Sequence, residues 1–574
     1  MTDYTLLYNA NIIVSYNDTN RYNYILFNHT TALIIEVGYD YSKLLGDPSI
    51  QHKHDCEQHT IIPGLIDSHI HVEYVGKHIV SLDLNLSTSI GMLQLRLKQY
   101  VDQQPNHDKS QWIVGFGWEQ DRLGRYPTRY DIDQICSDQP IILWRICHHI
   151  AVCNTKALQL AGITSNTQHH GGIIDLDSSH ELTGILRERS AEIVNELVVD
   201  NEEIRTSYIL AGLNECLVNG LTCVQTNDSN AWNIYKKLYD QGKIPIRVYL
   251  TIMYDELNNS HELRPNANEY YYSDHTTNDY MLNSHRIKLF GDGALGSETA
   301  ALSDNYVTVL HEKCNTVHTH SNGQHTPNST DIQHNDNKGV LIHQQSELTQ
   351  KVQRAHKLGY RIELHVIGDA ATDSGLTAFE QAGLQAIDRP ILTHCQVLRA
   401  DLLPRMKQLG VIANIQPQFT VTDSRWISDR LPSHLLTYSY IWKTLMNDGI
   451  HVAGGSDAPI ELCHPLLGIY SAIYRPYENY HAIQQVKQGK VIQRPDVDEC
   501  GRWIAGQCLS PQQALQIYTS EGAYCAGLEN KLGKLHTNYF ADLTILSVDP
   551  ILQSDQLLSD HIVQQVWVHG RRRL

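Results

Sequence analysis

The chain is poor in basic residues and has no long apolar run, and each absence excludes a class of protein. Lys and Arg number 45 against 63 Asp and Glu, which gives a net charge of −18. This balance disfavours polyanionic partners, so we expect neither nucleic-acid binding nor an anionic membrane surface. No run reaches the roughly eighteen apolar residues of a membrane span. The N-terminal segment also lacks the basic start of a secretory signal, so we predict a cytoplasmic protein.

The twelve cysteines include no C-x-x-C motif. Several lie in apolar strand-like runs, among them Cys223 and Cys395, so reduced and buried thiols explain them better than a disulfide framework. Cys395 directly follows His394 on the same predicted strand and should point to the opposite face. We therefore do not interpret Cys395 as a nucleophile.

Short apolar, β-branched runs alternate with helical patterns over the central part of the chain. Helical patterns such as 206–220 and 347–360 end at or near a glycine. Strands that alternate with helices indicate a parallel sheet, and eight such strands predict an α/β fold of the TIM-like (β/α)8 barrel type. The eight predicted strands are 61–69, 221–225, 246–252, 286–290, 361–366, 390–395, 411–415 and 451–454.

The first two predicted strands are much farther apart than the roughly 30 residues of an ordinary β/α unit. Residues 75–200 are therefore predicted to form an inserted domain after strand 1. The barrel itself is then built from residues 61–74 and 201–529.

Three further segments differ in residue pattern from the predicted barrel. Residues 1–60 and 530–574 both contain short strand-like runs separated by turn residues, which predicts one small β-sandwich built from both termini. Residues 312–338 are almost free of apolar side chains, which is typical of a disordered loop.

Five of the predicted strands carry, at or near their C-terminal ends, a side chain that can bind a metal. The C-terminal ends of barrel strands surround a single pocket, so residues far apart in sequence should meet there. Imidazoles, a lysine and a carboxylate are the groups that a hydrolytic divalent-metal site uses. The candidate ligands are His69, His71, Lys288, His365, His394 and Asp457.

The bare H-x-H pattern is weak evidence in a chain with 32 histidines. Two other triplets, at 52–54 and 318–320, lie in polar segments without strand character, where paired surface histidines are the simpler interpretation. His69 and His71 instead close the apolar run IIPGLIDSHIH. Alternate residues of a strand share a face, so both imidazoles can enter one pocket.

The other candidates each have a structural alternative. Lys288 lies inside an apolar strand, where a lysine must be paired or chemically changed; it is either a buried ion-pair partner or a carboxylated lysine that bridges two metals. His365 or His394 alone could be a satisfied core imidazole, and Asp457 could cap a turn. Their common position at strand ends favours the metal site.

Several motifs carry a family resemblance. PGLIDSHIH, IKLFGDGALGSETA, HVIGDAA, ILTHCQ and GSDAP resemble the amidohydrolase superfamily, in particular its amidohydrolase-3, YtcJ-like metal-dependent hydrolases. The resemblance extends over nearly the whole chain and implies two zinc ions. It places His69 and His71 on one metal, His365 and His394 on the other, a carboxylated Lys288 between them, and Asp457 as a metal ligand and catalytic proton carrier.

The resemblance implies hydrolysis of a non-peptide, amide-like carbon–nitrogen bond in a small molecule by a metal-bridging hydroxide. A deaminase of the superfamily is one alternative, but the glutamate that such enzymes carry shortly after the strand-five histidine is missing after His365. An esterase and a non-catalytic, metal-binding regulatory protein on the same fold are further alternatives. The complete ligand set favours an enzyme. The leaving group, the metal and the oligomeric state, including a homo-oligomer, stay open.

The chain departs from the family pattern near the expected substrate. Glu298 stands where the family usually has an arginine, and Cys147 and His148 replace a common Asp-Gly pair before His149. We take Glu298, His149 and Trp118 as candidate substrate-binding residues. An acid at position 298 predicts a weaker preference for anionic substrates.

Overall fold

The structure is a computed structural model that describes residues 3–574 except 104–108, 146–149, 170–171, 259–279, 310–331, 335–336, 491–493 and 495. It divides into two compact units, one of residues 1–72 with 213–574 and one of residues 73–212. The predicted inserted domain, 75–200, falls within the second unit. Of the predicted loop at 312–338, Ile332–His334 and 337–338 lie among the described residues, and Ile332–His334 (β17) pairs with Val307–Val309 (β16).

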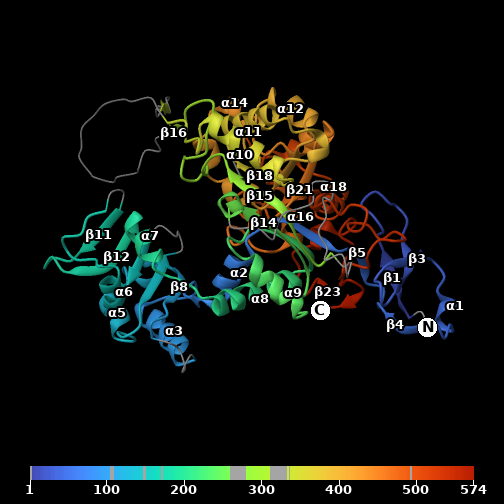
Figure 1. Ribbon diagram of the computed structural model, residues 1–574, viewed down its shortest axis with the longest axis horizontal. Helices are drawn as coiled ribbons and strands as arrows, with labels where there is room; N and C mark the ends of the chain where they lie inside the picture. The colour runs from blue at the N-terminus through green and yellow to red at the C-terminus, as the bar shows by residue number, and fades with distance from the viewer. Residues whose placement is uncertain are drawn as a thin grey trace. The chain divides into compact units, whose positions relative to one another are not determined.

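The first unit contains a sheet of eight parallel strands in a continuous order, which confirms the TIM-like barrel. Figure 1 shows β14, β15 and β18, which are consecutive neighbours in this sheet. Backbone hydrogen bonds from Asp457 to His69 (2.7 Å) and from His71 to Ala458 (2.9 Å) join the last strand's end to the first. The strands are β6 (Leu65–Ile70), β13 (Leu221–Thr226), β14 (Arg247–Met253), β15 (Leu282–Phe290), β18 (Arg361–Val366), β19 (Ile391–His394), β20 (Ile412–Ile415) and β21 (His451–Gly454).

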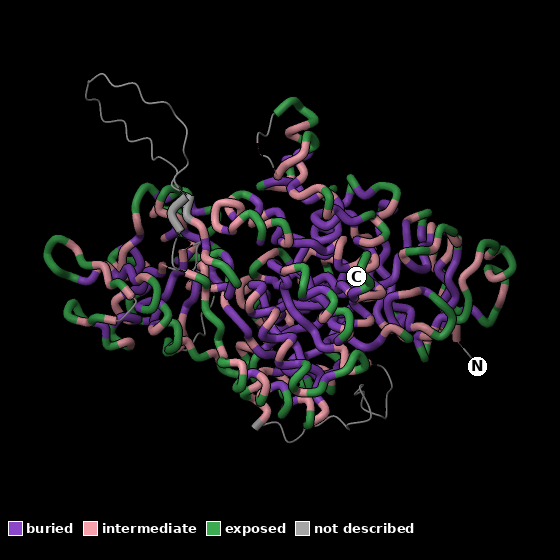
Figure 2. The backbone as a smooth tube through the Cα atoms, turned by 90° about the horizontal axis from the view of Figure 1, so that it is seen from above, coloured by how far each residue is buried: buried purple, intermediate pink, exposed green. Residues whose placement is uncertain are grey.

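Helices follow the barrel strands, as the alternating pattern predicts. They bury apolar stripes against the strands, as α10 does with Leu348, Val352 and Ala355. Figure 2 shows buried segments in the interior and exposed segments along the loops. The main helices of this layer are α9 (Trp232–Asp240), α10 (Gln345–Lys357), α11 (Asp369–Ala382), α12 (Leu402–Gln408), α15 (Trp442–Asn447), α16 (Pro465–Tyr474), α18 (Pro511–Ile517) and α19 (Ser520–Ala526).

The predicted strand 61–69 is in fact two strands. β5 (Thr60–Pro63) joins the sheet of the chain termini, and β6 starts the barrel after Gly64. A Cβ atom on Gly64 would lie 2.2 Å from the Thr222 hydroxyl oxygen, so only glycine lets the chain pass from one sheet to the other this close to β13.

Both ends of the chain contribute strands to one eight-stranded sheet, at the place where the sequence predicts a small β-sandwich. Its order is β24-β23-β22-β5-β1-β2-β3, and β4 pairs with β1. The prediction that residues 52–54 lack strand character was wrong, because they lie in β4, a polar edge strand held to β1 through its backbone. The strands are β1 (Tyr4–Ile12), β2 (Tyr22–Asn28), β3 (Ile34–Gly38), β4 (Ile50–Asp55), β5, β22 (Leu543–Leu546), β23 (Val563–Val568) and β24 (Arg571–Arg572).

The second unit has a core and a six-stranded sheet of its own, in the order β11-β12-β10-β9-β8-β7. Its strands are β7 (Leu82–Asp83), β8 (Ile113–Trp118), β9 (Ile141–Arg145), β10 (Ile150–Cys153), β11 (Gly172–Leu176) and β12 (Leu182–Glu188). Among the described residues of the whole chain, no helix has both the length and the apolar character to cross a bilayer.

Candidate metal centre

Four imidazoles meet at the C-terminal end of the barrel. His69 lies near the end of β6, His71 directly after it, His365 near the end of β18 and His394 at the end of β19. Their ring centroids are 5.3 Å apart for His69 and His71, 5.6 Å for His69 and His394, and 4.5 Å for His365 and His394. The rings therefore form one continuous group, as the strand ends predict.

Asp457, in the loop after β21, completes the group on the His69 side. One of its carboxylate oxygens (Oδ1) lies 3.4 Å from His69 Nε2 and 3.2 Å from His71 Nε2. One ligand atom from each of these three residues can be chosen so that all lie within 4.8 Å of one another. The approach is close, because a Cβ atom on Gly455 would lie 2.6 Å from the backbone nitrogen of His69. The three side chains fit a divalent metal by donor type and by proximity.

Three of the four imidazoles are held through Nδ1 by a different partner each, and Nδ1 of the fourth, His365, lies near a carboxylate, so that Nε2 is the atom left for a ligand in all four. Metal-binding histidines usually have this second contact, which fixes the ring and its tautomer. The contact of His365 has the distance but not the geometry of a hydrogen bond. The four pairs are His69 with Glu363 (3.0 Å), His71 with the Asn227 carbonyl (2.8 Å), His394 with the Gln416 amide oxygen (2.8 Å) and His365 with Asp292 (3.2 Å).

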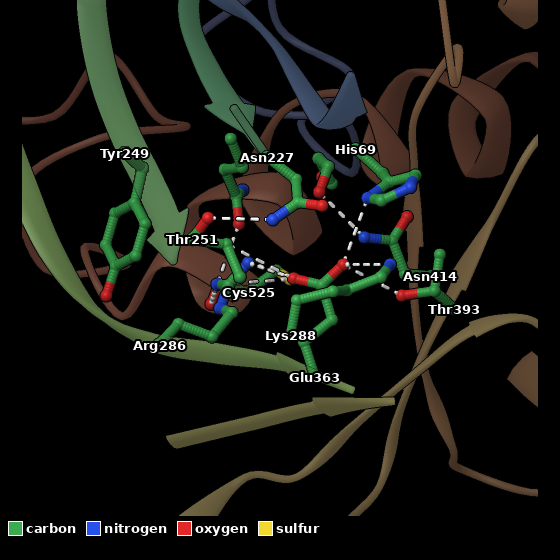
Figure 3. Close-up of polar contacts among 12 residues, drawn as sticks. His69, Asn227, Tyr249, Thr251, Arg286, Lys288, Glu363, Thr393, Asn414 and Cys525 are labelled. Carbon is green, nitrogen blue, oxygen red and sulfur yellow. Dashed lines mark hydrogen bonds and ion pairs between the residues drawn. The ribbon is translucent and has the colours of Figure 1, made fainter. Parts of the chain in front are cut away.

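Glu363 lies at the centre of the polar network in Figure 3. Its side chain is 1% exposed, and one oxygen (Oε1) is 3.0 Å from both His69 Nδ1 and Lys288 Nζ. The other oxygen (Oε2) is 3.2 Å from the Arg286 guanidinium. Threonine hydroxyls of Thr251 and Thr393 donate hydrogen bonds to the same carboxylate. The sequence analysis missed Glu363, although its place two residues before His365 on β18 puts both on one face.

Lys288 projects into the barrel from β15, as predicted, and is 1% exposed. In its unmodified form it is an ion-pair partner of Glu363, which matches the structural alternative for this residue. Its ammonium also lies 5.7 Å from the centroid of the Phe290 ring. Glu363 balances the Lys288 charge only in part, because Arg286 shares the same carboxylate.

Two aspartates that the sequence analysis did not select hold the loops of the site. Asp292, after β15, accepts backbone hydrogen bonds from Ala301, Ile367 and Gly368. Asp67, on β6, accepts backbone hydrogen bonds from His69 and Ser456. Asp292 lies in the GDG segment and Asp67 in the IDSH segment. Both segments lie next to predicted ligands, and this position is the sequence feature that could have identified the two aspartates.

Burial and neighbouring charge act in opposite directions on the two carboxylates. Burial raises the pKa of Asp457, but its contacts with His69 and His71 outweigh burial and leave that pKa well below its usual range. Burial likewise raises the pKa of Glu363, but the Lys288 charge and the His69 contact bring it well below normal. Both groups are therefore carboxylates at neutral pH.

The pKa values of His394 and His71 are shifted in opposite directions. Burial and the charge of His365 hold the pKa of His394 well below its usual range, so His394 is neutral and able to bind a metal. Burial lowers the pKa of His71, but Asp457 and the Asn227 carbonyl outweigh it and the pKa is raised.

The structure describes two of the three candidate substrate-binding residues, Glu298 and Trp118. Glu298 lies in the loop after β15, with its carboxylate 3.9 Å from the Arg430 guanidinium. Trp118 has no exposed surface, and its indole N–H donates to the Leu143 carbonyl (2.7 Å), so its burial does not support a contact with substrate. His149, like Cys147 and His148, lies outside the described residues.

Comparison with known proteins decides the family. A model described as the amidohydrolase family matches residues 54–573. The chain belongs to the amidohydrolase family. This amidohydrolase is 30% identical over 501 residues to the amidohydrolase YtcJ of Bacillus subtilis (strain 168), a match that covers 85% of this chain and 84% of that one. The predicted family is confirmed, and the coarse function that follows is that of a metal-dependent hydrolase.

Two further proteins are similar over most of their length. The N-substituted formamide deformylase of Arthrobacter pascens is 23% identical over 533 residues, covering 90% of this amidohydrolase and 88% of that enzyme. The crystal structure of an uncharacterised metal-dependent hydrolase from Pyrococcus furiosus is 26% identical, with a TM-score of 0.73, covering 96% and 100% of the two chains.

Proposed function

We propose that this amidohydrolase hydrolyses a non-peptide, amide-like carbon–nitrogen bond in a small molecule. The observation that carries the proposal is the common orientation of His69 and His71. Each is held through Nδ1 and directs Nε2 at the carboxylate of Asp457. The similarity to a protein named as a formamide deformylase supports an amide-like substrate.

A divalent metal bound by these residues would polarise the substrate carbonyl and lower the pKa of a water nucleophile. Side chains of the site carry out the proton transfers and hold the ligands in place. Asp457 is a carboxylate at neutral pH, so it can accept a proton from the attacking water and return it to the leaving nitrogen. Glu363 keeps the His69 ring in place while this happens, because it holds Nδ1 rather than Nε2.

Two zinc ions bridged by a carboxylated Lys288 stay our prediction for the full centre. His365 and His394, with ring centroids 4.5 Å apart, supply two imidazoles for a second ion. The competing observation is the 3.0 Å contact of Lys288 with Glu363, since carboxylation would place a second anion there. The number of zinc ions at the barrel centre, located by anomalous diffraction in the wild type and in Lys288→Ala, decides between them. A drop from two ions to one or none supports the bridge, whereas one ion in both proteins contradicts it.

The proposed activity is tested by a substrate panel on zinc-loaded protein. N-formyl, N-acyl and cyclic amides and a matched set of esters would be compared, with Asp457→Asn as the inactive control. We expect amide turnover that the control loses. Turnover of esters alone, or release of ammonia from amino-substituted rings, would instead support the esterase or deaminase alternative. Bound zinc without any turnover would support a regulatory protein. Cytoplasmic location and homo-oligomerisation stay predictions.

A further inference from the structure

A second group of metal-binding side chains lies on the sheet of the chain termini, where three neighbouring strands meet. Asp3 directly precedes β1, His29 directly follows β2, and His52 lies on β4. One ligand atom from each can be chosen so that all lie within 4.8 Å of one another. We propose that Asp3, His29 and His52 bind a divalent cation of the zinc class, at a site separate from the barrel centre.

The backbone register brings these side chains to one face of the sheet. The backbone N–H of His29 donates to the carbonyl of Asp3 (2.9 Å), so the two residues lie opposite each other across β1 and β2. On the other side of β1, Thr5 pairs with His52. Asp3 and Thr5 are alternate residues and share a face, so all three donors project to the same side. The convergence therefore follows from strand pairing.

The side-chain contacts hold the donors together. His52 Nε2 lies 3.1 Å from Asp3 Oδ2, and the His29 and His52 rings stack with centroids 4.2 Å apart. The Thr5 hydroxyl lies 3.0 Å from His29 Nδ1 and orients that ring. The two imidazoles and the carboxylate thus form one cluster rather than three separate surface groups.

One oxygen of the cluster lacks a partner. Asp3 Oδ1 is inaccessible to solvent and accepts no hydrogen bond from any described residue. A buried carboxylate oxygen without a donor is costly, and a bound cation would remove that cost. This atom is the independent sign that the cluster holds a ligand.

The donor set suits zinc. Two imidazoles and one carboxylate bind this ion at about 2.0–2.2 Å, which places tetrahedral donors about 3.3 Å apart. The donors must therefore close from the present arrangement by small rotations. These rotations are possible because the side chains of Asp3 and His52 are 25% and 41% exposed. A cation held there would tie the start of β1 to both neighbouring strands, with water in the remaining position.

Zinc counting on the full chain tests the proposal. The protein would be dialysed to equilibrium against micromolar zinc and its bound zinc measured in the wild type, His52→Gln, His29→Gln and Asp3→Asn. His54→Gln is the matched control, because His54 is also half-buried and lies on the same face of β4 but outside the cluster. We expect the three cluster variants to bind one zinc fewer, or to bind it at least about tenfold more weakly. The control should bind as the wild type does, and hydrolase activity should be unchanged in all four variants.

Two results would overturn the site. One is an equal zinc count and affinity in the wild type and every cluster variant. The other comes from wild-type crystals and needs no variant to fold: zinc anomalous density at the barrel centre with none between Asp3, His29 and His52. In the zinc count, binding that begins only at millimolar zinc is scored as the absence of a resident ion.

Discussion

Two H-x-H triplets lie at strands in the described part of the chain, which leaves out the third at 318–320, yet only one of the two sends both imidazoles into one cluster. His69 and His71 both direct Nε2 at Asp457. In the triplet on β4, His52 joins Asp3 and His29, whereas the His54 ring packs edge-on against Trp567 at 5.2 Å. In both triplets, the alternation of side chains along a strand places the two imidazoles on the same face of the sheet. The neighbours around that face decide whether it becomes a metal site.

The two clusters also differ in what surrounds them. The His69 side chain is 3% exposed and Glu363 holds it from behind, whereas the His52 side chain is 41% exposed. A barrel surrounds its donors with strand ends on every side, while an open sheet offers only adjacent strands. We therefore expect the barrel centre to bind metal more tightly and to carry the chemistry.

The largest expected effect is a loss of turnover that occurs when the barrel centre is changed and not when the Asp3 cluster is changed. Asp457→Asn removes the proton acceptor of the barrel centre, so kcat should fall by about 10²–10⁴-fold. Asp3→Asn, the same change in the other cluster, should leave kcat as it is. Steady-state kinetics on zinc-loaded proteins checks both. Comparable losses in the two variants would show that the clusters are not functionally distinct.

Removing the support behind His69 should have the next largest effect. Glu363→Gln weakens the hold on Nδ1 and removes the negative charge between Lys288 and Arg286, so zinc affinity should fall by about 10–100-fold. Thr393→Val removes only one neutral hydrogen bond to the same carboxylate and serves as the control. Competition with a chromophoric zinc chelator measures both affinities. Equal affinities in the two variants would mean that Glu363 does not position His69.

A buried carboxylate outside the metal centre, Asp423, should behave in the opposite way to Glu363. Burial raises the pKa of Asp423 from 3.8 to about 7, while Tyr440 and Gln396 donate hydrogen bonds to it. The folded protein therefore keeps a proton that the unfolded chain releases above about pH 4. The stability contributed by this proton is present below pH 4 and is lost as the pH rises through 7.

Asp423→Asn imitates the protonated state and tests this sign. Between pH 5 and pH 8 the melting temperature of the wild type should fall more than that of the variant, by about 2 °C. Calorimetric scans at one heating rate provide the comparison. A steeper fall in the variant would contradict the assigned pKa shift.

The smallest effect concerns substrate charge. Arg430 lies 3.9 Å from the Glu298 carboxylate and offsets part of its charge. Glu298→Arg should raise the ratio of kcat/KM for anionic over cationic substrates only a few-fold, because both side chains are partly exposed. Zinc content should not change. An unaltered ratio would leave Glu298 as a residue that only holds its loop.

Sequence periodicity was sufficient for the barrel and for the approach of four histidines, because strand ends in this fold must meet. It failed at Gly64, where one apolar run serves two sheets, and at residues 52–54, where a polar edge strand has no apolar alternation. It also missed Glu363, whose role depends on five partners from four other strands. Such partners are set by packing across the barrel, which a linear pattern does not contain.

The position of bound zinc relative to the two nitrogens of His69 tests the central claim most directly. Anomalous diffraction at the zinc edge from crystals of the full chain should place an ion about 2.0–2.1 Å from Nε2 of both His69 and His71. The Nδ1 atoms should still face Glu363 and the Asn227 carbonyl. Zinc bound through Nδ1, or a barrel centre without zinc in active protein, would contradict the account.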